Sequence, residues 1–340
     1  MRIPVIILGA PRSGTTLLRN LLNRHPQLAM CGETAFFDMI YRRLGAFGDL
    51  ADATNRARAV DAYLSTQRVQ QLKIDIALLR ERLLRDGATA RDFFRTILEC
   101  YAQTCGKPYT GEKTPRHCGW ATTFVEWFPQ CAIVHLVRDP RDSCSSLITM
   151  PWESRSVLRA ARIWRNYNAA ALAVADRENY LRISYESLAA ESAVTLQRIC
   201  AHVGLPFAPE MLNVPASGHQ NWWHTRAWQG VMPTRIGKWR DSLDPWQASA
   251  IEAVDGELMA QLGYEPQAPP AKPWTMARAY LDGIFEVGLQ KFSRLPVAFF
   301  YLLRPTQLST EEKWRRRATA LYGRLRSPAP PDEERAQTAT

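Results

Sequence analysis

The chain has 340 residues, of which 46% are hydrophobic and 22% are charged, and its formal net charge is +10. This composition is typical of a folded protein and excludes an intrinsically disordered chain, while the length predicts one large domain with an appendage or two domains. No uninterrupted apolar stretch of 18 residues occurs, which argues against a membrane span. The positive charge leaves open an anionic substrate, a nucleic acid or a membrane surface as the partner.

The chain begins with a strand, a glycine-containing turn and a helix. In IPVIILGAPRSGTTLLRNLL the apolar run predicts a strand over Val5–Leu8, and the hydroxyl-led amphipathic pattern behind the turn predicts a helix. The spacing of Gly9 and Gly14 matches the phosphate-binding pattern G-x-x-x-x-G-K-[ST], but Thr15 occupies the lysine position. Backbone N–H groups at the positive end of the helix can still hold an anion. The missing lysine argues against a P-loop kinase, and the nearest cation is Arg12.

The middle of the chain alternates between strand and helix patterns. Residues 51–91 show Arg- and Leu-rich helical periodicity, which predicts a helical insertion. Further strands are predicted at Tyr109–Gly111, Ala132–Val137 and Tyr180–Ser184, each followed by a helical pattern. This alternation predicts an α/β fold with a P-loop-type parallel sheet flanked by helices, and a ligand at the carboxyl ends of the strands.

The last third of the chain contains a closing helix, a linker and an appendage. Asp244–Leu262 predicts an amphipathic helix, with Pro245 near its start and Gly263 after its end. Pro266–Pro273 is rich in Pro and Ala and predicts a linker. The predicted organisation is a main domain over 1–266, a basic helical appendage over 267–326 and a disordered tail over 327–340.

The appendage is basic and partly apolar. Lys272–Arg326 contains eleven Lys or Arg residues against four Asp or Glu, together with apolar runs such as PVAFFYLL at Pro296–Leu303. Interleaved basic and apolar residues are typical of a helix that lies on a membrane surface. They are also typical of helices that pack on the core with a solvated basic face. The length of the apolar run favours the second interpretation.

Two segments carry a resemblance to a known family. GAPRSGTTLLRNLLNRHPQLAMCGET resembles the 5′-phosphosulfate-binding loop of sulfotransferases that use 3′-phosphoadenosine 5′-phosphosulfate (PAPS), and is most similar to the bacterial carbohydrate-type and tyrosylprotein branches. AIVHLVRDPRDSCSSLITM resembles the second family signature, which implies that Arg138 and Ser146 bind the 3′-phosphate. The resemblance covers about residues 3–264. It implies transfer of a sulfuryl group from PAPS to a hydroxyl or amine acceptor. The predicted insertion at residues 51–91 would lie over the acceptor site, although a solvated helix pair also fits these residues.

In-line sulfuryl transfer moves negative charge onto the departing phosphate oxygen, while the acceptor must lose a proton. The site therefore needs cations at the leaving group and a base at the acceptor. In the loop, the predicted phosphate-binding residues are Arg12, Ser13, Gly14, Thr15 and Thr16. The resemblance implies that Lys113, in GEKTP, supplies a second cation, although a solvated lysine at a strand end is the alternative. No metal-ligand cluster is visible in the sequence, so we expect transfer without a metal.

Two residues compete for the role of base. Glu33 corresponds, counting without gaps from Arg12, to the catalytic glutamate of the tyrosylprotein branch, and a glutamate is ionised at neutral pH. His117, in KTPRHCGW, is the rival because other branches use a histidine in this region. A helix-cap or core histidine explains the same pattern. We favour Glu33, on the criterion that a base must lie within reach of the proton that it removes.

Three further features extend the predicted site. Tyr185, in ISYESL, matches a family tyrosine near the adenine, although a buried tyrosine at a strand end fits as well. Arg235 and Lys238, in PTRIGKWRDSL, resemble the loop that closes on the 3′-phosphate. The nearby tryptophans match no family pattern, and they suit either acceptor stacking or buried packing: Trp222, Trp223 and Trp228.

The cysteine pattern and the position of the first strand bear on the cellular compartment of the protein. The seven cysteines form no C-x-x-C pair and are odd in number, and the first strand begins close to Met1, so we expect a cytoplasmic protein with reduced thiols and no signal peptide. Peripheral contact with the inner face of the membrane through residues 272–326 is the alternative. The acceptor is a carbohydrate, lipid, peptide or other small molecule. A non-enzymatic nucleotide- or nucleic-acid-binding protein is disfavoured by the paired phosphate motifs, and the oligomeric state stays open.

Overall fold

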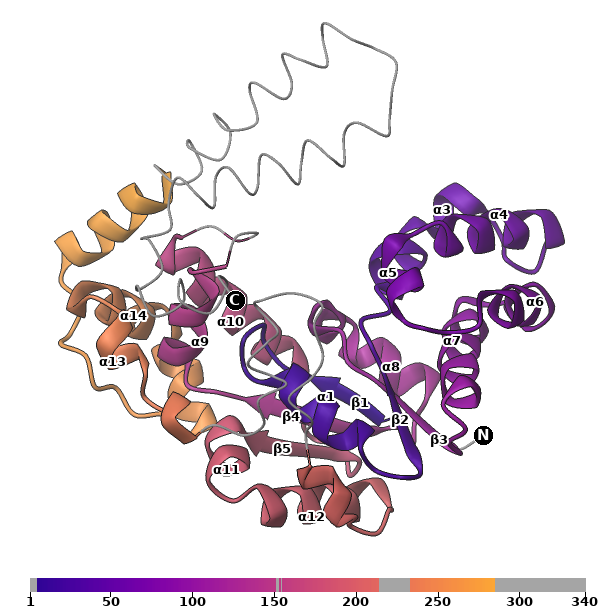
Figure 1. Cartoon of the computed structure of the whole chain (residues 1–340). Coiled ribbons are helices and arrows are strands. Elements are labelled where there is room, and N and C mark those ends of the chain that lie inside the picture. The colour runs from indigo at the N-terminus through magenta and orange to yellow at the C-terminus, as the bar shows by residue number, and fades with distance from the viewer. Residues whose placement is uncertain (1–4, 151–152, 154, 214–232, 285–340) are drawn as a thin grey trace, which may run out of the picture.

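The computed structural model describes residues 5–150, 153, 155–213 and 233–284. A five-stranded parallel sheet lies at its centre, in the order β2-β3-β1-β4-β5, with helices on both faces (Figure 1). The strands are β1 (Val5–Leu8), β2 (Leu28–Cys31), β3 (Tyr109–Glu112), β4 (Ala132–Val137) and β5 (Tyr180–Ser184). The predicted α/β fold with a parallel sheet is confirmed.

Strand β2 is the element that the sequence analysis missed. It follows the first helix and pairs with β3 in parallel, with Cys31 opposite Glu112. Glu112 also lies opposite Ile6 of β1. The carboxyl end of β3 therefore lies between the ends of β2 and β1, and residues that follow β2 and β3 come close to the glycine-containing turn after β1.

Helices of the first half begin at clear caps. The side chains of Asp52, Thr66, Asp75 and Thr89 each accept a backbone N–H group at a helix start, as N-caps do. Helices α3 to α6 lie together on the side of the sheet where β2 and β3 lie (Figure 1), which confirms the predicted helical insertion. The elements are α1 (Thr15–Asn23), α2 (Phe36–Met39), η1 (Tyr41–Arg43), α3 (Leu44–Phe47), α4 (Ala53–Leu64), α5 (Gln67–Gln71), α6 (Ile76–Asp86) and α7 (Ala90–Thr104).

The second half closes with a well-capped helix. Asp244 and Gln247 form a capping box at the start of α14, and Gly263 ends the helix in the left-handed region at φ 87°. The predicted closing helix is confirmed. The elements are η2 (Pro115–Trp120), α8 (Ala121–Trp127), α9 (Pro140–Leu147), α10 (Val157–Leu172), α11 (Tyr185–Ala190), α12 (Ser192–Val203), η3 (Pro209–Leu212), η5 (Pro233–Arg235), α13 (Trp239–Ser242) and α14 (Pro245–Leu262).

The core divides along the alternation of β1. Ile6 and Leu8 face one side of the sheet and pack with the insertion, α7 and α8. Val5 and Ile7 face the other side and pack with α1, α11 and α12. A third cluster joins α9, α10 and α14. Every side chain of this four-residue strand is buried, as expected for the central strand of a parallel sheet with covered faces.

The described part of the predicted appendage rests on the main body. Residues 273–284 are helical, so the helix begins at the last residue of the predicted linker. Ala279 is fully buried within the α9, α10 and α14 cluster. Residues 285–340 and the three clustered tryptophans of the sequence analysis lie outside the described residues, and the domain division stays a prediction. Within the described residues, none of the helices has the length and apolarity needed to cross a bilayer.

Candidate active site

The turn between β1 and α1 has a backbone that glycine makes possible. Gly14 has φ 92°, and a Cβ atom there would lie 2.6 Å from the ring of Tyr185. Gly9 has φ 154°, and its Cβ atom would lie 2.5 Å from the carbonyl oxygen of Leu136. Arg12 adopts φ 69°, a conformation that is strained for a residue with a side chain and that is often found at functional sites. The turn is therefore fixed in one shape at the positive end of α1, whose first turn contains no acidic residue.

Buried side chains hold this turn from behind. Cys118 accepts a hydrogen bond from the Gly9 N–H group at 3.0 Å and donates its S–H group to the Gly9 carbonyl oxygen at 3.5 Å. Burial raises the pKa of the Cys118 thiol to about 12, so the group stays protonated. The buried hydroxyl of Ser13 lies 3.4 Å from that of Ser143.

The residues predicted to bind the 3′-phosphate meet the turn. Arg12 donates a hydrogen bond from Nε to Ser146 Oγ at 3.0 Å. Arg138 donates from Nη1 to the Arg12 carbonyl oxygen at 3.3 Å, and its guanidinium carbon lies 4.2 Å from the centre of the Tyr185 ring. Burial raises the pKa of the Tyr185 phenol, which therefore stays neutral. The structure brings these four predicted residues into one cluster.

The segment before α13 is fastened to the same cluster. Arg138 donates from Nη2 to the Arg235 carbonyl oxygen at 2.7 Å. Asp142, in the first turn of α9, accepts the backbone N–H groups of Gly237 and Trp239, each at 2.8 Å. Asp142 also lies 3.5 Å from Arg138, so one buried carboxylate joins the strand end to this segment.

A second cluster lies on the other side of the turn. Lys113 Nζ is 2.7 Å from Glu33 Oε1 and 3.3 Å from Thr16 Oγ1, at the start of α1. Arg68, from helix α5 of the insertion, lies 3.0 Å from Glu33 Oε2. The Lys113 side chain is 4% exposed, whereas that of Glu33 is 32% exposed and within reach of solvent. One ammonium group therefore connects a partly exposed carboxylate to the predicted phosphate-binding turn.

Two predicted residues are placed apart from these contacts. The His117 side chain is 1% exposed and packs against Phe37, with ring centres 4.9 Å apart. Neither of its ring nitrogens has a hydrogen-bond partner among the described residues. Lys238 is exposed and forms an ion pair with Asp241 at 2.7 Å.

Sequence reasoning missed three supporting residues. Asp142 was visible as an acidic residue in the first turn of a predicted helix, but its binding of a distant backbone segment has no local pattern. Arg68 and Cys118 come from elements far away in the sequence, so no motif connects them to the site. Among the described residues, no group of three or more His, Cys, Asp or Glu side chains is arranged to hold a metal ion. Transfer without a metal stays a prediction.

Comparisons with known proteins agree with this fold. A family model described as "Sulfotransferase family" matches residues 4–209. Protein-tyrosine sulfotransferase A of Caenorhabditis elegans is 23% identical, with 85% of this chain and 75% of the relative covered. Nodulation protein NoeE of Sinorhizobium fredii is 25% identical, with 79% and 68% covered. The sulfotransferase domain of the Synechococcus PCC 7002 olefin synthase has a TM-score of 0.56 at 23% identity, over 78% of this chain and 95% of that domain.

Proposed function

Because the chain belongs to the sulfotransferase family and is a sulfuryl-transfer enzyme, we propose that its donor is PAPS and that its acceptor is a hydroxyl or amine group. The observation that carries this proposal is the pair of clusters on the two sides of one turn. On one side Lys113 contacts Thr16 at the start of α1 and binds Glu33, while on the other Arg138 and Ser146 contact Arg12.

The residues present fit a nucleotide with phosphates at both ends. The 5′ end would be held by the backbone N–H groups of the turn, by Arg12 and by the hydroxyls of Thr15 and Thr16. Arg138 would bind the 3′-phosphate with Ser146. Its Nε atom is buried and has no hydrogen-bond partner among the described residues, so it can donate to an anion. Bound PAPS supplies the sulfuryl group and a phosphate leaving group.

The second cluster supplies the acid–base chemistry. Glu33 would take the proton of the acceptor, since it is partly exposed and adjacent to the turn. Lys113 would stabilise negative charge that develops between the acceptor and the leaving group, because its ammonium lies between Glu33 and Thr16. His117 is buried among aromatic rings, and we assign it no proton transfer.

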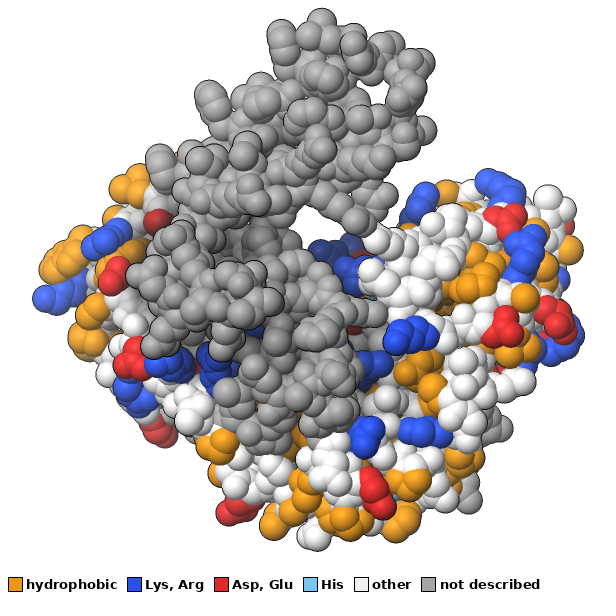
Figure 2. Space-filling view, viewed as in Figure 1, with side chains coloured by type: hydrophobic (Ala, Val, Ile, Leu, Met, Phe, Trp, Pro, Cys, Tyr) orange, Lys and Arg blue, Asp and Glu red, His pale blue; other side chains and the backbone are white. Residues whose placement is uncertain are grey.

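The insertion would line the acceptor side. Arg68 of α5 reaches Glu33, so α5 lies where an acceptor must approach the proposed base. By their names, one of the relatives above acts on protein tyrosine, one is a nodulation protein and one is a domain of an olefin synthase. We propose a peptide, carbohydrate, lipid or small-molecule acceptor for this chain. Toward the two sides of the face shown in Figure 2, described Lys and Arg side chains lie among Asp and Glu side chains, and nucleic acid is not part of the proposal.

The proposal is tested with PAPS labelled on its sulfur atom. The protein is incubated with tyrosyl peptides, oligosaccharides and hydroxylated lipids, with and without a chelator. We expect label in one acceptor class, with equal yield when metal is chelated, and loss of transfer in Glu33→Gln. Mg²⁺-dependent turnover of ATP without sulfuryl transfer would support a P-loop kinase instead. Abolition by the chelator, with recovery on adding Mg²⁺, would contradict the metal-free mechanism.

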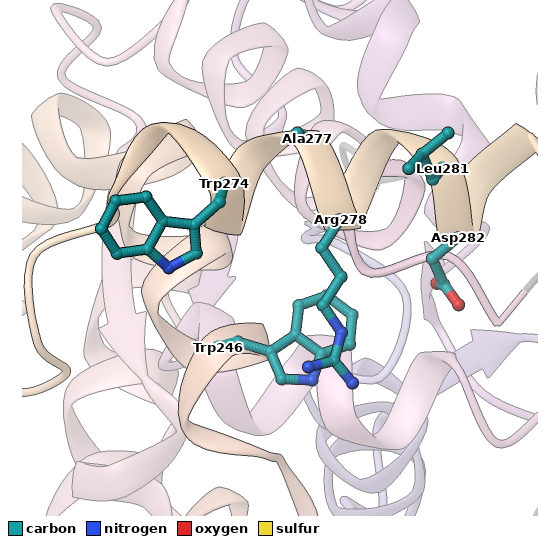
Figure 3. A pocket seen from close by; sticks show the side chains of 6 residues that line it. All are labelled: Trp246, Trp274, Ala277, Arg278, Leu281 and Asp282. Carbon is teal, nitrogen blue, oxygen red and sulfur yellow. The ribbon is translucent and has the colours of Figure 1, made fainter.

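A cytoplasmic location with peripheral membrane contact is a separate part of the proposal. Residues 273–284 form a helix that exposes three large apolar side chains, those of Trp274, Leu281 and Ile284, to 66%, 66% and 68%. Arg278 lies between the first two, over the ring of Trp246 (Figure 3). An exposed apolar row with a cation suits the interface of an anionic membrane.

Sedimentation with vesicles tests the membrane contact. The full-length chain should sediment with vesicles that contain anionic lipid at low salt and should be released as salt rises. The double variant Trp274→Ser/Leu281→Ser should bind less, while the control Val194→Ser, which changes an exposed residue of α12, should bind normally. Equal binding by all three proteins would place the membrane contact elsewhere.

A further inference from the structure

We propose that Glu112 is a positioning residue that sets the relative placement of Glu33 and Lys113. The proposal rests on the function proposed above for those two residues. The Glu112 carboxylate binds the hydroxyl of the residue that follows each of them in the chain.

The Glu112 carboxylate is fully buried at the carboxyl end of β3. Its Oε1 atom accepts hydrogen bonds from two hydroxyls, those of Thr34 at 3.2 Å and of Thr114. A buried carboxylate is costly unless hydrogen bonds compensate for the lost water, and breaking such a network is more costly than its formation is favourable. The two threonines are therefore held firmly by the same oxygen atom.

These bonds connect the chain segments that carry the proposed chemistry. Thr34 follows Glu33 directly after β2, and Thr114 follows Lys113 directly after β3. The two segments are thus joined twice, by the Glu33–Lys113 ion pair that faces the site and by the buried Thr34–Glu112–Thr114 bridge. The Thr34 carbonyl oxygen also accepts the hydroxyl of Tyr63 at 3.1 Å, which fixes the same segment to helix α4.

The other oxygen of the Glu112 carboxylate lies next to His117. The Nδ1 atom of His117 is 3.2 Å from Glu112 Oε2, but the two atoms are not aligned as a hydrogen bond. Phe37 and Phe124 contact the imidazole ring and separate it from solvent. His117 therefore packs beside the Thr34–Glu112–Thr114 bridge in the core. The bridge, and not His117, connects the chain segments that carry Glu33 and Lys113.

The sharpest test is Thr34→Val, which removes one hydroxyl and keeps the shape of the side chain. We expect kcat to fall by about 10- to 100-fold, because a displacement of about 1 Å at a reacting group costs that much. The KM for the donor should stay within about threefold, since no proposed donor contact is removed. Thr34→Ser keeps the donor and should restore most of the lost turnover.

Thr110→Val is the matched control. Thr110 lies on β3, the strand that carries Glu112, is buried, and donates its hydroxyl to the Leu98 carbonyl oxygen at 3.0 Å. It should lower the melting temperature to a similar extent as Thr34→Val but leave kcat unchanged. Thr114→Val removes the other hydroxyl of the bridge and should also lower kcat without raising the donor KM, and it provides the test if Thr34→Val does not fold.

The outcomes separate this inference from the proposed function. If Glu33→Gln is inactive while Thr34→Val and Thr114→Val keep kcat within twofold of wild type, the positioning role is refuted and the base assignment stands. Loss of kcat in Thr110→Val equal to that in Thr34→Val would refute it too, because both would then act through stability. If Glu33→Gln is fully active, the proposed base is wrong, whatever the threonine variants do.

Discussion

Replacing Arg138 with alanine should change the preference between two donors as well as the affinity for each. PAPS and adenosine 5′-phosphosulfate differ in the 3′-phosphate that Arg138 is proposed to bind. A charge-assisted hydrogen bond contributes about 1.5–3 kcal/mol, which is about 10- to 150-fold in affinity. The variant should therefore lose most of its preference for PAPS.

The structure predicts a second effect that is common to both nucleotides. Arg138 also donates to the carbonyl oxygens of Arg12 and Arg235, so its removal loosens the turn and the segment before α13. Both nucleotides should bind more weakly for this reason. The ratio of the two dissociation constants removes the shared loss and isolates the contact to the 3′-phosphate.

Isothermal titration calorimetry of both nucleotides at one ionic strength measures this ratio. Arg198→Ala is the control, because it removes one positive charge from an exposed residue of α12, an element that carries none of the proposed phosphate contacts. It should leave the ratio unchanged. If Arg138→Ala weakens PAPS and adenosine 5′-phosphosulfate equally, Arg138 does not bind the 3′-phosphate and the assignment of this cluster fails.

Two other predictions concern the base and the pH dependence of stability. Glu33→Gln should reduce turnover by about 10² to 10⁴ while donor affinity stays within a few-fold, whereas His117→Ala should reduce turnover per folded molecule by less than about tenfold. The reverse result in a single-turnover assay would make His117 the base. Burial raises the pKa of Asp255 from 3.8 to about 8, and neither of its oxygens has a hydrogen-bond partner among the described residues. The folded state thus retains a proton that the unfolded chain releases, so this stabilisation is complete below about pH 4 and is lost as pH rises through about 8. Between these pH values the free energy of unfolding should fall by about 1.4 kcal/mol per pH unit. Denaturant unfolding of Asp255→Asn should show a flatter dependence of that free energy on pH. An unchanged profile in the variant would contradict the assignment.

Local patterns were sufficient where one short segment carries both the structure and the chemistry. The strands β1, β4 and β5 were predicted with their observed bounds, and β1 and β4 are the buried, mostly apolar runs that are typical of parallel strands. The spacing of Arg138 and Ser146 also lies within one strand–helix unit. Their meeting with Arg12 follows because β4 pairs with β1 in the sheet.

The features that were not predicted from the sequence depend on pairing between segments that are distant in the chain. The four residues LAMC resemble many short apolar runs, and they become β2 because β3 lies beside them. That pairing brings Glu33 to Lys113. The burial of His117 depends in the same way on Phe37 and Phe124, which come from two other elements. A choice between the two candidate bases therefore required the packing, since both residue types are chemically suitable.

The burial of Cys118 beside Gly9 also affects how the protein can be labelled. Alkylating reagents attack the thiolate, which is scarce at Cys118 because its pKa is about 12, and burial blocks their approach. Of the seven cysteines, six are buried and Cys105, at the end of α7, is exposed. A fluorophore or spin label can therefore be attached to the native chain at one site without modifying the turn. If Cys118 became reactive during such an experiment, its modification would report that the packing beside the turn had opened.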